Sequence, residues 1–245
     1  MTPNLRRQLR RYPARILSIP VRMRHPGRFR VIDRVVADRR TYLSYLALWD
    51  LVQRVEQLER ASAPGIFIET GCALGGSAVV IASVKNPQRI FRVYDTFGLI
   101  PPPSNKDGDD VRSRYENIRS GRAVGLGGDT YYGYQEDLLG QVRNSFAHYG
   151  YSADSSSVEL VQGFFEDTLI GSEPVAFAHI DCDWYESVST CLDRIVPRLI
   201  PGGVLVLDDY DHWSGCRRAV DDFFDRRQEE FSFNHRQRLH IIRRS

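Results

Sequence analysis

The sequence predicts an α/β fold with a mostly parallel seven-stranded sheet and helices on both faces. Two observations lead to this fold class. Short apolar runs recur along the chain with helix-length segments between them, and an acidic pair follows two of these runs. The first pair is Asp181 and Asp183 in HIDCDWY, and the second is Asp208 and Asp209 in VLVLDDY. Since parallel sheets bind ligands at the carboxyl ends of their strands, we expect both pairs at one edge of the sheet.

The remaining elements follow from the spacing of apolar residues. The segment 41–60 has apolar residues at helical spacing, which predicts an amphipathic helix whose aromatic residues belong to the core rather than to a site. The other expected elements are a strand at 65–70, a glycine turn opening a helix at 71–86, a strand at 89–97, a crossover helix at 135–149, strands at 157–165 and 175–183, a helix within 185–203, a strand at 202–210, a helix at 216–227 and closing strands at 231–236 and 239–244.

Length and charge indicate one catalytic domain, residues 41–245, after a basic N-terminal extension, residues 1–40. Residues 1–30 hold nine arginines and no acidic residue, so the rest of the chain has 24 basic against 31 acidic residues, a net charge of about −7. The extension could contact an anionic lipid surface, a phosphate-bearing acceptor or a partner subunit. It could equally be a solvated arm that packs on its own domain.

Composition also limits the compartment and the partners. The sequence has no run of the ~20 apolar residues that a membrane span needs, and its Arg-rich start lacks the apolar centre of a secretion signal. We therefore expect a cytoplasmic protein that assembles as a homo-oligomer and binds no nucleic acid. The four cysteines lie inside predicted core elements without zinc-type spacing, which predicts buried thiols: Cys72, Cys182, Cys191 and Cys216.

The connection at about 98–134 is too long for an ordinary loop and is rich in Pro, Gly, Asp and Tyr. A long connection of this kind in a compact domain is typical of an active-site lid, which is the first interpretation. A disordered surface loop is the alternative. It is disfavoured because three tyrosines, Tyr131, Tyr132 and Tyr134, are poor composition for disorder.

The two acidic pairs predict a divalent-cation site. Neighbouring strands are about 4.8 Å apart, and carboxylates at that distance repel one another unless a cation or protons lie between them. Two alternatives remain open. Asp181-Cys182-Asp183 is a D-x-D sequence, which metal-dependent glycosyltransferases use to hold a sugar nucleotide diphosphate. In a non-catalytic scaffold, the aspartates would merely cap helices.

The glycine turn favours S-adenosylmethionine (SAM) over a dinucleotide. Its pattern from Glu69 to Gly76 is E-x-G-x-x-x-G-G, which lacks the G-x-G-x-x-G spacing that seats a pyrophosphate. An acid before the first glycine would repel phosphate and suits a ligand with a cationic amino group, as in SAM. Asp95, at the end of the next strand, is placed to bind the two ribose hydroxyls of a nucleoside.

Taken together, the blocks FIETGCALGGSA, VYDTFGLIPPP, GFFEDTL, HIDCDWYES and GGVLVLDDYDHWSGCRRAVDDF resemble the TylF/macrocin O-methyltransferase family between about residues 65 and 225. Members of this family are metal-dependent class I methyltransferases that modify sugars on macrolides and aminocoumarins. The resemblance implies a Rossmann-like class I methyltransferase fold. It also implies binding of SAM by Glu69, Thr70, Gly71, Gly75, Ser77 and Asp95, with the adenine beside Phe165, Asp167 and Thr168.

The resemblance also assigns the metal ligands and the catalytic base. The ligand positions of the family fall on Asp181, Asp208 and Asp209, for Mg²⁺ or another divalent cation. The base position of the aminocoumarin-sugar branch falls on Asp183, whereas the histidine of the macrolide-sugar branch is replaced by Trp184. His212 is a second candidate base, unless it simply caps the next helix. The lid start FGLIPPPSN differs from the family's usual acidic-glycine version, which leaves the acceptor open.

The mechanism implied is transfer of the SAM methyl group to a sugar hydroxyl. Coordination to Mg²⁺ stabilises the alkoxide of a hydroxyl that is otherwise a poor nucleophile, by several kcal/mol. Three carboxylates leave coordination positions for two neighbouring hydroxyls, which predicts an acceptor with a vicinal diol. Asp183 would accept the hydroxyl proton as the oxygen attacks the methyl group.

Overall fold

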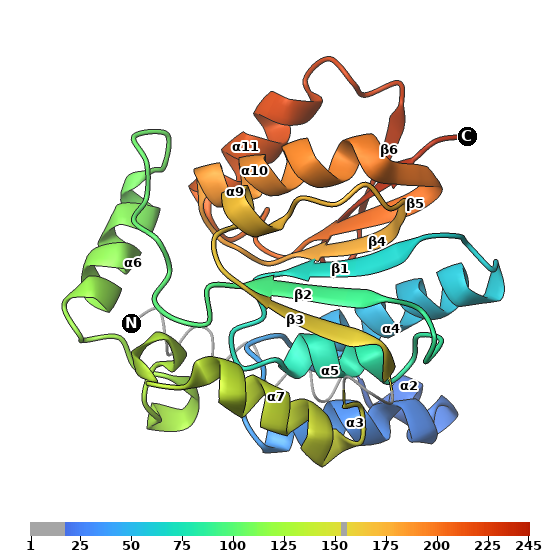
Figure 1. The fold of residues 1–245 in the computed structure, drawn as a ribbon, viewed down its shortest axis with the longest axis horizontal. Coiled ribbons are helices and arrows are strands. Elements are labelled where there is room, and N and C mark those ends of the chain that lie inside the picture. Colours follow the sequence, from blue (N-terminus) through green and yellow to red (C-terminus); the bar gives the residue numbers. More distant parts are fainter. Residues whose placement is uncertain (1–17, 153–155) are drawn as a thin grey trace.

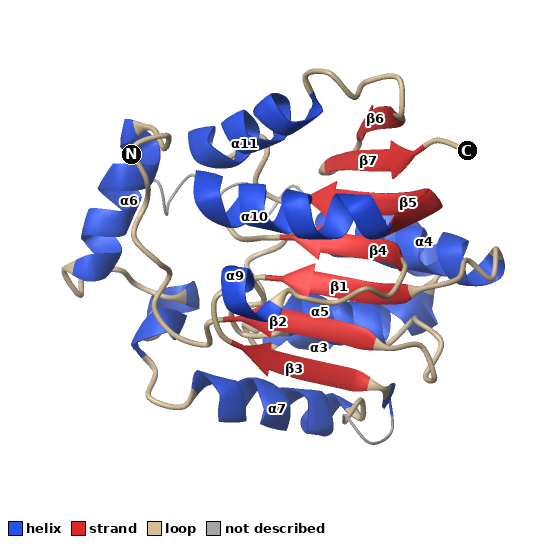
Figure 2. Cartoon of the chain, turned by 45° about the horizontal axis from the view of Figure 1, so that its top comes forward, coloured by secondary structure: helices blue, strands red, loops and turns tan. Residues whose placement is uncertain are grey.

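The computed structural model describes residues 18–152 and 156–245, which form a seven-stranded sheet in the order β3-β2-β1-β4-β5-β7-β6. The first five strands of that order pair in parallel, and β7 and β6 close the sheet in antiparallel orientation, as the arrowheads in Figure 2 show. The strands are β1 (Ile66–Thr70), β2 (Phe91–Asp95), β3 (Val158–Gln162), β4 (Val175–Ile180), β5 (Leu199–Leu207), β6 (Phe231–His235) and β7 (Leu239–Arg243). The predicted mostly parallel sheet is confirmed.

Helices cover both faces of the sheet (Figure 1). One face is covered by α3 (Pro26–Ala37), α4 (Tyr45–Arg60), α5 (Gly76–Ala82) and α7 (Leu138–Tyr149). The other face is covered by α9 (Phe165–Thr168), α10 (Tyr185–Ile195) and α11 (Ser214–Phe224). The short helix α2 (Ile19–Arg24) precedes α3, and the 3₁₀ turn η3 (Val196–Arg198) links α10 to β5.

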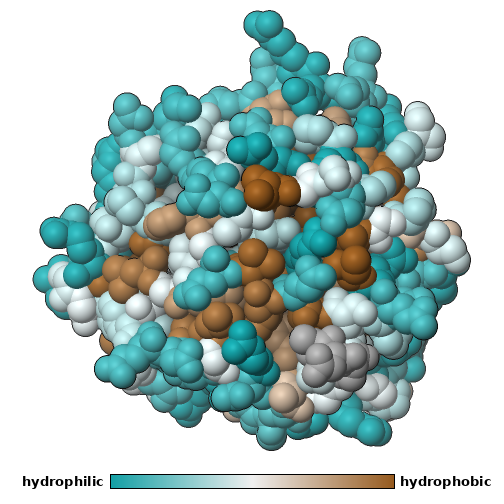
Figure 3. All heavy atoms as spheres, in the orientation of Figure 1, coloured by the Kyte–Doolittle hydropathy of each residue, from teal (hydrophilic) through white to brown (hydrophobic). Residues whose placement is uncertain are grey.

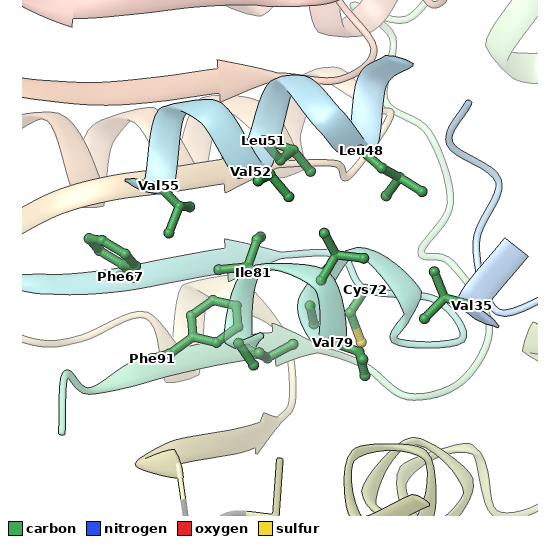
Figure 4. Close-up of a cluster of buried hydrophobic side chains, with 14 of the residues drawn as sticks. Val35, Leu48, Leu51, Val52, Val55, Phe67, Cys72, Val79, Ile81 and Phe91 are labelled. Atoms are coloured by element: carbon green, nitrogen blue, oxygen red, sulfur yellow. The ribbon is translucent and has the colours of Figure 1, made fainter. Parts of the chain in front are cut away.

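Each face has its own hydrophobic core because β1 and β4 are buried at every position and alternate residues point to opposite sides. Figure 4 shows the first core, in which Leu51 and Val55 of α4 lie over Phe67 of β1 and Phe91 of β2. The second core packs the apolar side of α10 and α11 against Ile68 and its neighbours. The two cores hold the strand ends, and hence the acidic loops, in fixed positions.

The expected elements are present, with three differences. Strands β4 and β5 end at Ile180 and Leu207, so Asp181, Asp183 and Asp208 lie in loops rather than in strands. The helix expected at 41–60 begins only at Tyr45, because Ser44 caps it by accepting a hydrogen bond from the backbone N–H of Ala47. The third difference is a set of helices that the sequence did not predict, namely α2, α3, α9 and a helix inside the insert, α6 (Asp109–Arg119).

Helix α3 belongs to the same core as α4, although it falls within the segment expected to be an extension. Phe29, Ile32 and Val35 are buried in the first core. Two of the nine arginines, Arg22 and Arg28, form ion pairs within the fold, with Asp33 and Glu56 respectively. The predicted boundary at residue 40 therefore separates two helices that share one core. Five of the nine arginines lie outside the described residues.

The 98–134 insert is folded rather than an open loop. It contains α6 (Asp109–Arg119) and two 3₁₀ turns, η1 (Leu126–Gly128) and η2 (Tyr132–Tyr134). Ile118, Ala123 and Tyr131 form a small core of its own, and the Tyr134 hydroxyl donates to the Ile118 carbonyl. Figure 2 shows α6 beyond the carboxyl ends of the parallel strands, where a lid would lie.

The cysteines agree with the prediction of buried thiols. All four are free and buried. In the face seen in Figure 3, apolar side chains appear as separate groups among hydrophilic ones. None of the helices within 18–152 and 156–245 combines the length and apolar character that a bilayer crossing requires.

Candidate active site

A cavity of about 780 Å³ lies at the carboxyl ends of the parallel strands. Its floor comes from the loops that follow β1, β2, β4 and β5, and its walls come from α9, the insert and the residues before α4. The floor residues are Gly71, Ala73, Asp95, Asp181, Cys182, Asp183, Asp208 and Asp209.

Three of the four predicted aspartates converge in this floor. Asp181, Asp208 and Asp209 each offer a carboxylate oxygen, and these oxygens lie within 4.8 Å of one another. Burial and the negative charges of Asp208 and Asp209 raise the pKa of Asp181 well above its usual range. Burial and Asp208 likewise raise the pKa of Asp209. The carboxylates thus repel each other, as the sequence analysis expected.

The donor set fits a divalent cation. Oδ2 of Asp209 is buried and has no hydrogen-bond partner among the described residues. Three carboxylates this close together need protons or a cation between them. Oxygen ligands from carboxylates are those that Mg²⁺ prefers. The D-x-D alternative instead pairs Asp181 with Asp183, whereas the geometry groups Asp181 with the two aspartates after β5.

Asp208 differs from its neighbours because basic side chains hold it. Nε of Arg238 lies 2.6 Å from its Oδ1, and Nε2 of His179 lies 3.8 Å from the same oxygen. Burial alone would raise the pKa of Asp208, but Arg238 and His179 bring it below its usual value. Asp208 is therefore ionised and fixed in place without a metal.

Asp183 and His212 both line the cavity beside this cluster. Asp183 has a left-handed backbone, with φ +59°. Such a conformation is uncommon outside glycine and concentrates at functional sites. Nδ1 of His212 lies 3.3 Å from the backbone carbonyl of Asp208, so His212 is anchored to the same loop.

The glycine turn packs directly on the acidic loop. Gly71 has φ +82°, and a Cβ atom there would lie 2.0 Å from the carbonyl oxygen of Asp181. Only glycine fits this close approach. Asp95 fastens the turn from the other side, because its Oδ2 accepts hydrogen bonds from the backbone N–H groups of Cys72 and Ala73 at 2.7 and 3.2 Å.

The residues expected to bind SAM divide into two groups. Those that line the cavity are Gly71, Asp95, Phe165 and Asp167. Those that do not are Glu69, Thr70, Gly75, Ser77 and Thr168. Glu69 was expected to face a cationic amino group, but its side chain is fully buried and its Oε1 lies 2.7 Å from Nδ1 of His179. The Thr168 hydroxyl donates to the Phe164 carbonyl inside α9.

Some cavity residues were not found from the sequence. Tyr42 and Ser44 line the cavity ahead of α4, which corrects the expectation that the aromatic residues of 41–60 belong only to the core. Arg238 reaches the cavity from the turn between β6 and β7. These residues lie far from the acidic motifs in sequence, and no local pattern marks them. A signal did exist for His179, since the charged Glu69 in an otherwise apolar strand requires a buried partner.

The insert is fastened to the two helices that follow the acidic loops. The Asp107 carboxylate accepts a hydrogen bond from the backbone N–H of Tyr185, at the start of α10, at 2.8 Å. Asp110 accepts one from the N–H of Ser214, at the start of α11, at 2.9 Å. The indole of Trp184 donates to the carbonyl of Pro101 at 2.9 Å. Carboxylates at helix N-termini are favourable, so the insert and the floor stabilise each other.

Two proteins of similar sequence carry the names of O-methyltransferases. One is the 8-demethyl-8-(2,3-dimethoxy-alpha-L-rhamnosyl)-tetracenomycin-C 4'-O-methyltransferase of Streptomyces olivaceus, 32% identical over 177 residues, which are 69% of this chain and 61% of that protein. The other is the Mycinamicin III 3''-O-methyltransferase of Micromonospora griseorubida, 29% identical over 76% of this chain and 70% of that protein. The chain thus spans less than two thirds of the first relative's length.

Solved structures confirm the fold. The O-methyltransferase NovP has a TM-score of 0.69 at 24% identity, over 84% of this chain and 83% of that one. The calicheamicin methyltransferase CalS11 has a TM-score of 0.58 at 18% identity, over 86% and 85% of the two chains. The fold is therefore the Rossmann-like fold of class I methyltransferases. The family model described as Macrocin-O-methyltransferase (TylF) matches residues 44–235, so this chain belongs to the TylF family.

Proposed function

We propose that this protein transfers a methyl group from SAM to a hydroxyl group of a sugar or of a glycosylated natural product, with Mg²⁺ or another divalent cation as cofactor. The observation that carries the proposal is the set of Asp181, Asp208 and Asp209 in the floor of a cavity that also holds Gly71 and Asp95. The proposed metal ligands and the predicted cofactor turn thus open onto one space. Family membership and the names of the relatives support the same reaction.

The cofactor would lie along the glycine turn. The backbone of Gly71 is exposed to the cavity without a side chain, and the Asp95 carboxylate faces the same space and could accept from ribose hydroxyls. Phe165 and Asp167, at the start of α9, form the neighbouring wall. Phe165 offers an apolar surface for an adenine ring, and Asp167 offers an acceptor for a polar edge of that ring.

The acceptor would lie between the acidic floor and the insert. Asp181, Asp208 and Asp209 would hold the metal ion, which when bound lowers the pKa of a coordinated hydroxyl. Asp183 would accept the hydroxyl proton as the C–O bond forms and the C–S bond of the sulfonium breaks, leaving a neutral thioether. The carboxylates leave room for two adjacent hydroxyls, which supports a vicinal-diol acceptor.

Mass spectrometry tests the reaction. The protein would be incubated with SAM, Mg²⁺ and a panel of diol-bearing glycosides, and a product heavier by one CH₂ unit is expected. The same mixture with EDTA in excess of Mg²⁺ should give no product. Full activity in EDTA would refute the metal requirement. Binding of a sugar nucleotide diphosphate with no response to SAM would instead support the glycosyltransferase alternative.

A further inference from the structure

Glu69 and His179 form a buried pair beneath the acidic cluster. They are opposite each other on the parallel strands β1 and β4, and both side chains are fully buried. Nδ1 of His179 lies 2.7 Å from Oε1 of Glu69. The other ring nitrogen, Nε2, lies 3.8 Å from Oδ1 of Asp208, which is within ion-pair distance but longer than a hydrogen bond. Strands β1 and β4 and the loop after β5 thus contribute one row of polar side chains that ends at a proposed metal ligand.

We propose that Glu69 and His179 are positioning residues that orient Asp208 for binding of a divalent cation. The inference rests on the metal site of the proposed function. It goes further by giving a role to two residues that touch neither the cavity nor the reacting groups.

The orientation follows from which oxygen is contacted. Arg238 and His179 both approach Oδ1 of Asp208, at 2.6 and 3.8 Å. The hydrogen bond from Arg238 and the nearby His179 ring hold Oδ1, which limits the rotation of the carboxylate and leaves Oδ2 on the side away from them. Oδ2 of Asp208 is then oriented for a metal ion before the ion binds. Partners behind a metal ligand that fix its orientation are worth ~10–100-fold in metal affinity.

The contact with His179 explains why an acidic residue, Glu69, can lie in the buried strand β1. Every position of β1 is buried, so the charge of Glu69 requires a partner of opposite sign or a hydrogen-bond donor. His179 supplies the donor through Nδ1, and Glu69 in turn fixes the plane of the imidazole ring. Without Glu69 the ring could turn its Nε2 away from Asp208. Glu69 therefore acts on Asp208 through His179.

Titration calorimetry of Mg²⁺ into the metal-free full chain tests the inference without any turnover. His179→Gln should weaken Mg²⁺ binding ~10–100-fold relative to the unsubstituted protein. Glu69→Gln keeps the shape and one acceptor, and should weaken Mg²⁺ binding by a smaller factor. The affinity for SAM, titrated separately, should stay within about threefold for both variants, because neither side chain lines the cavity. If His179→Gln does not fold, Glu69→Gln decides.

His240 provides a matched control. It lies on β7, is as fully buried as His179, and its Nε2 lies 2.9 Å from Oδ2 of Asp50, which is no metal ligand. His240→Gln should lower the melting temperature but leave Mg²⁺ affinity unchanged. Equal loss of Mg²⁺ affinity in His240→Gln and His179→Gln would reduce the role of His179 to general stability and overturn the inference.

Other outcomes separate the inference from the proposed function. Absence of Mg²⁺ binding in the unsubstituted protein would refute the metal site and the inference together. Normal Mg²⁺ binding in His179→Gln, with binding intact in the unsubstituted protein, would refute the inference alone. Loss of SAM affinity in Glu69→Gln with unchanged Mg²⁺ affinity would assign Glu69 to the cofactor and also refute it.

Discussion

The floor of the cavity and the insert beside it are stabilised by different interactions. The floor consists of short loops between strands that are buried on both faces, so its carboxylates are fixed by the sheet and by contacts such as Arg238 to Asp208. The insert has only a small core around Ile118 and Tyr131, and a few polar contacts hold it to the rest. The proposed chemistry thus lies on the rigid part, whereas the proposed acceptor would be enclosed by a part that can change independently.

The largest expected effect comes from removing a floor carboxylate. Asp208→Asn should lower turnover at least 10³-fold, about 4 kcal/mol in the barrier, because the metal ion would lose a charged ligand. SAM affinity, measured by calorimetry, should be retained. The control is Asp211→Asn, three residues after Asp208, which should have near-normal turnover because Asp211 is exposed and paired only with Arg217. Undiminished turnover in Asp208→Asn would refute the role of the floor.

Asp183→Asn tests whether proton transfer and metal binding belong to different residues of the floor. Asparagine tolerates the left-handed backbone of this position, so the variant removes charge without adding strain. Turnover should fall ~10²–10⁴-fold, as for loss of a general base, while Mg²⁺ and SAM affinities remain within a few-fold. If steady-state kinetics show near-normal turnover, the base is His212 or a residue of the insert.

Part of the candidate site could be predicted from the sequence. The four aspartates could be placed at one edge because each pair follows an apolar run and the intervening helix returns the chain to the adjacent strand. Asp95 was found for the same reason. Tyr42 and Arg238 could not be found, because their positions depend on how α4 and the β6–β7 turn pack on the sheet, which is a tertiary property. Helix α6 was missed because its segment is rich in charged and turn-forming residues.

A smaller effect is expected at the cofactor turn. Asp95→Asn removes the charge of the carboxylate proposed to accept from the ribose hydroxyls of SAM, and it weakens hydrogen bonds from the backbone of Cys72, Ala73 and Phe97. Losing one charge-assisted hydrogen bond to the ribose costs ~1.5 kcal/mol, so SAM should bind about tenfold more weakly. Calorimetry would measure this change, with Mg²⁺ affinity as the internal reference. A tenfold loss for Mg²⁺ instead of SAM would mean that Asp95 serves the acidic cluster.

The smallest effect is expected in the insert. Asp107 is buried and accepts from the backbone of Ser104 and Tyr185, so Asp107→Asn should cost ~1–2 kcal/mol of unfolding free energy and raise the acceptor KM a few-fold, with kcat little changed. Asp109→Asn, a fully solvated neighbour on α6, is the control. Denaturant unfolding and steady-state kinetics would measure both. A loss of kcat as large as in Asp208→Asn would contradict the assignment of the chemistry to the floor alone.

The backbone of Gly71 packs directly against the backbone carbonyl of Asp181, and this contact affects how such enzymes can acquire new substrates. Because main-chain atoms rather than side chains set the spacing between these two loops, ordinary substitutions nearby would leave the proposed methyl donor and metal ion at the same separation. Residues of the enclosing wall could then be exchanged to admit other acceptors without disturbing the proposed methyl transfer. A side chain at position 71 would force the two loops apart.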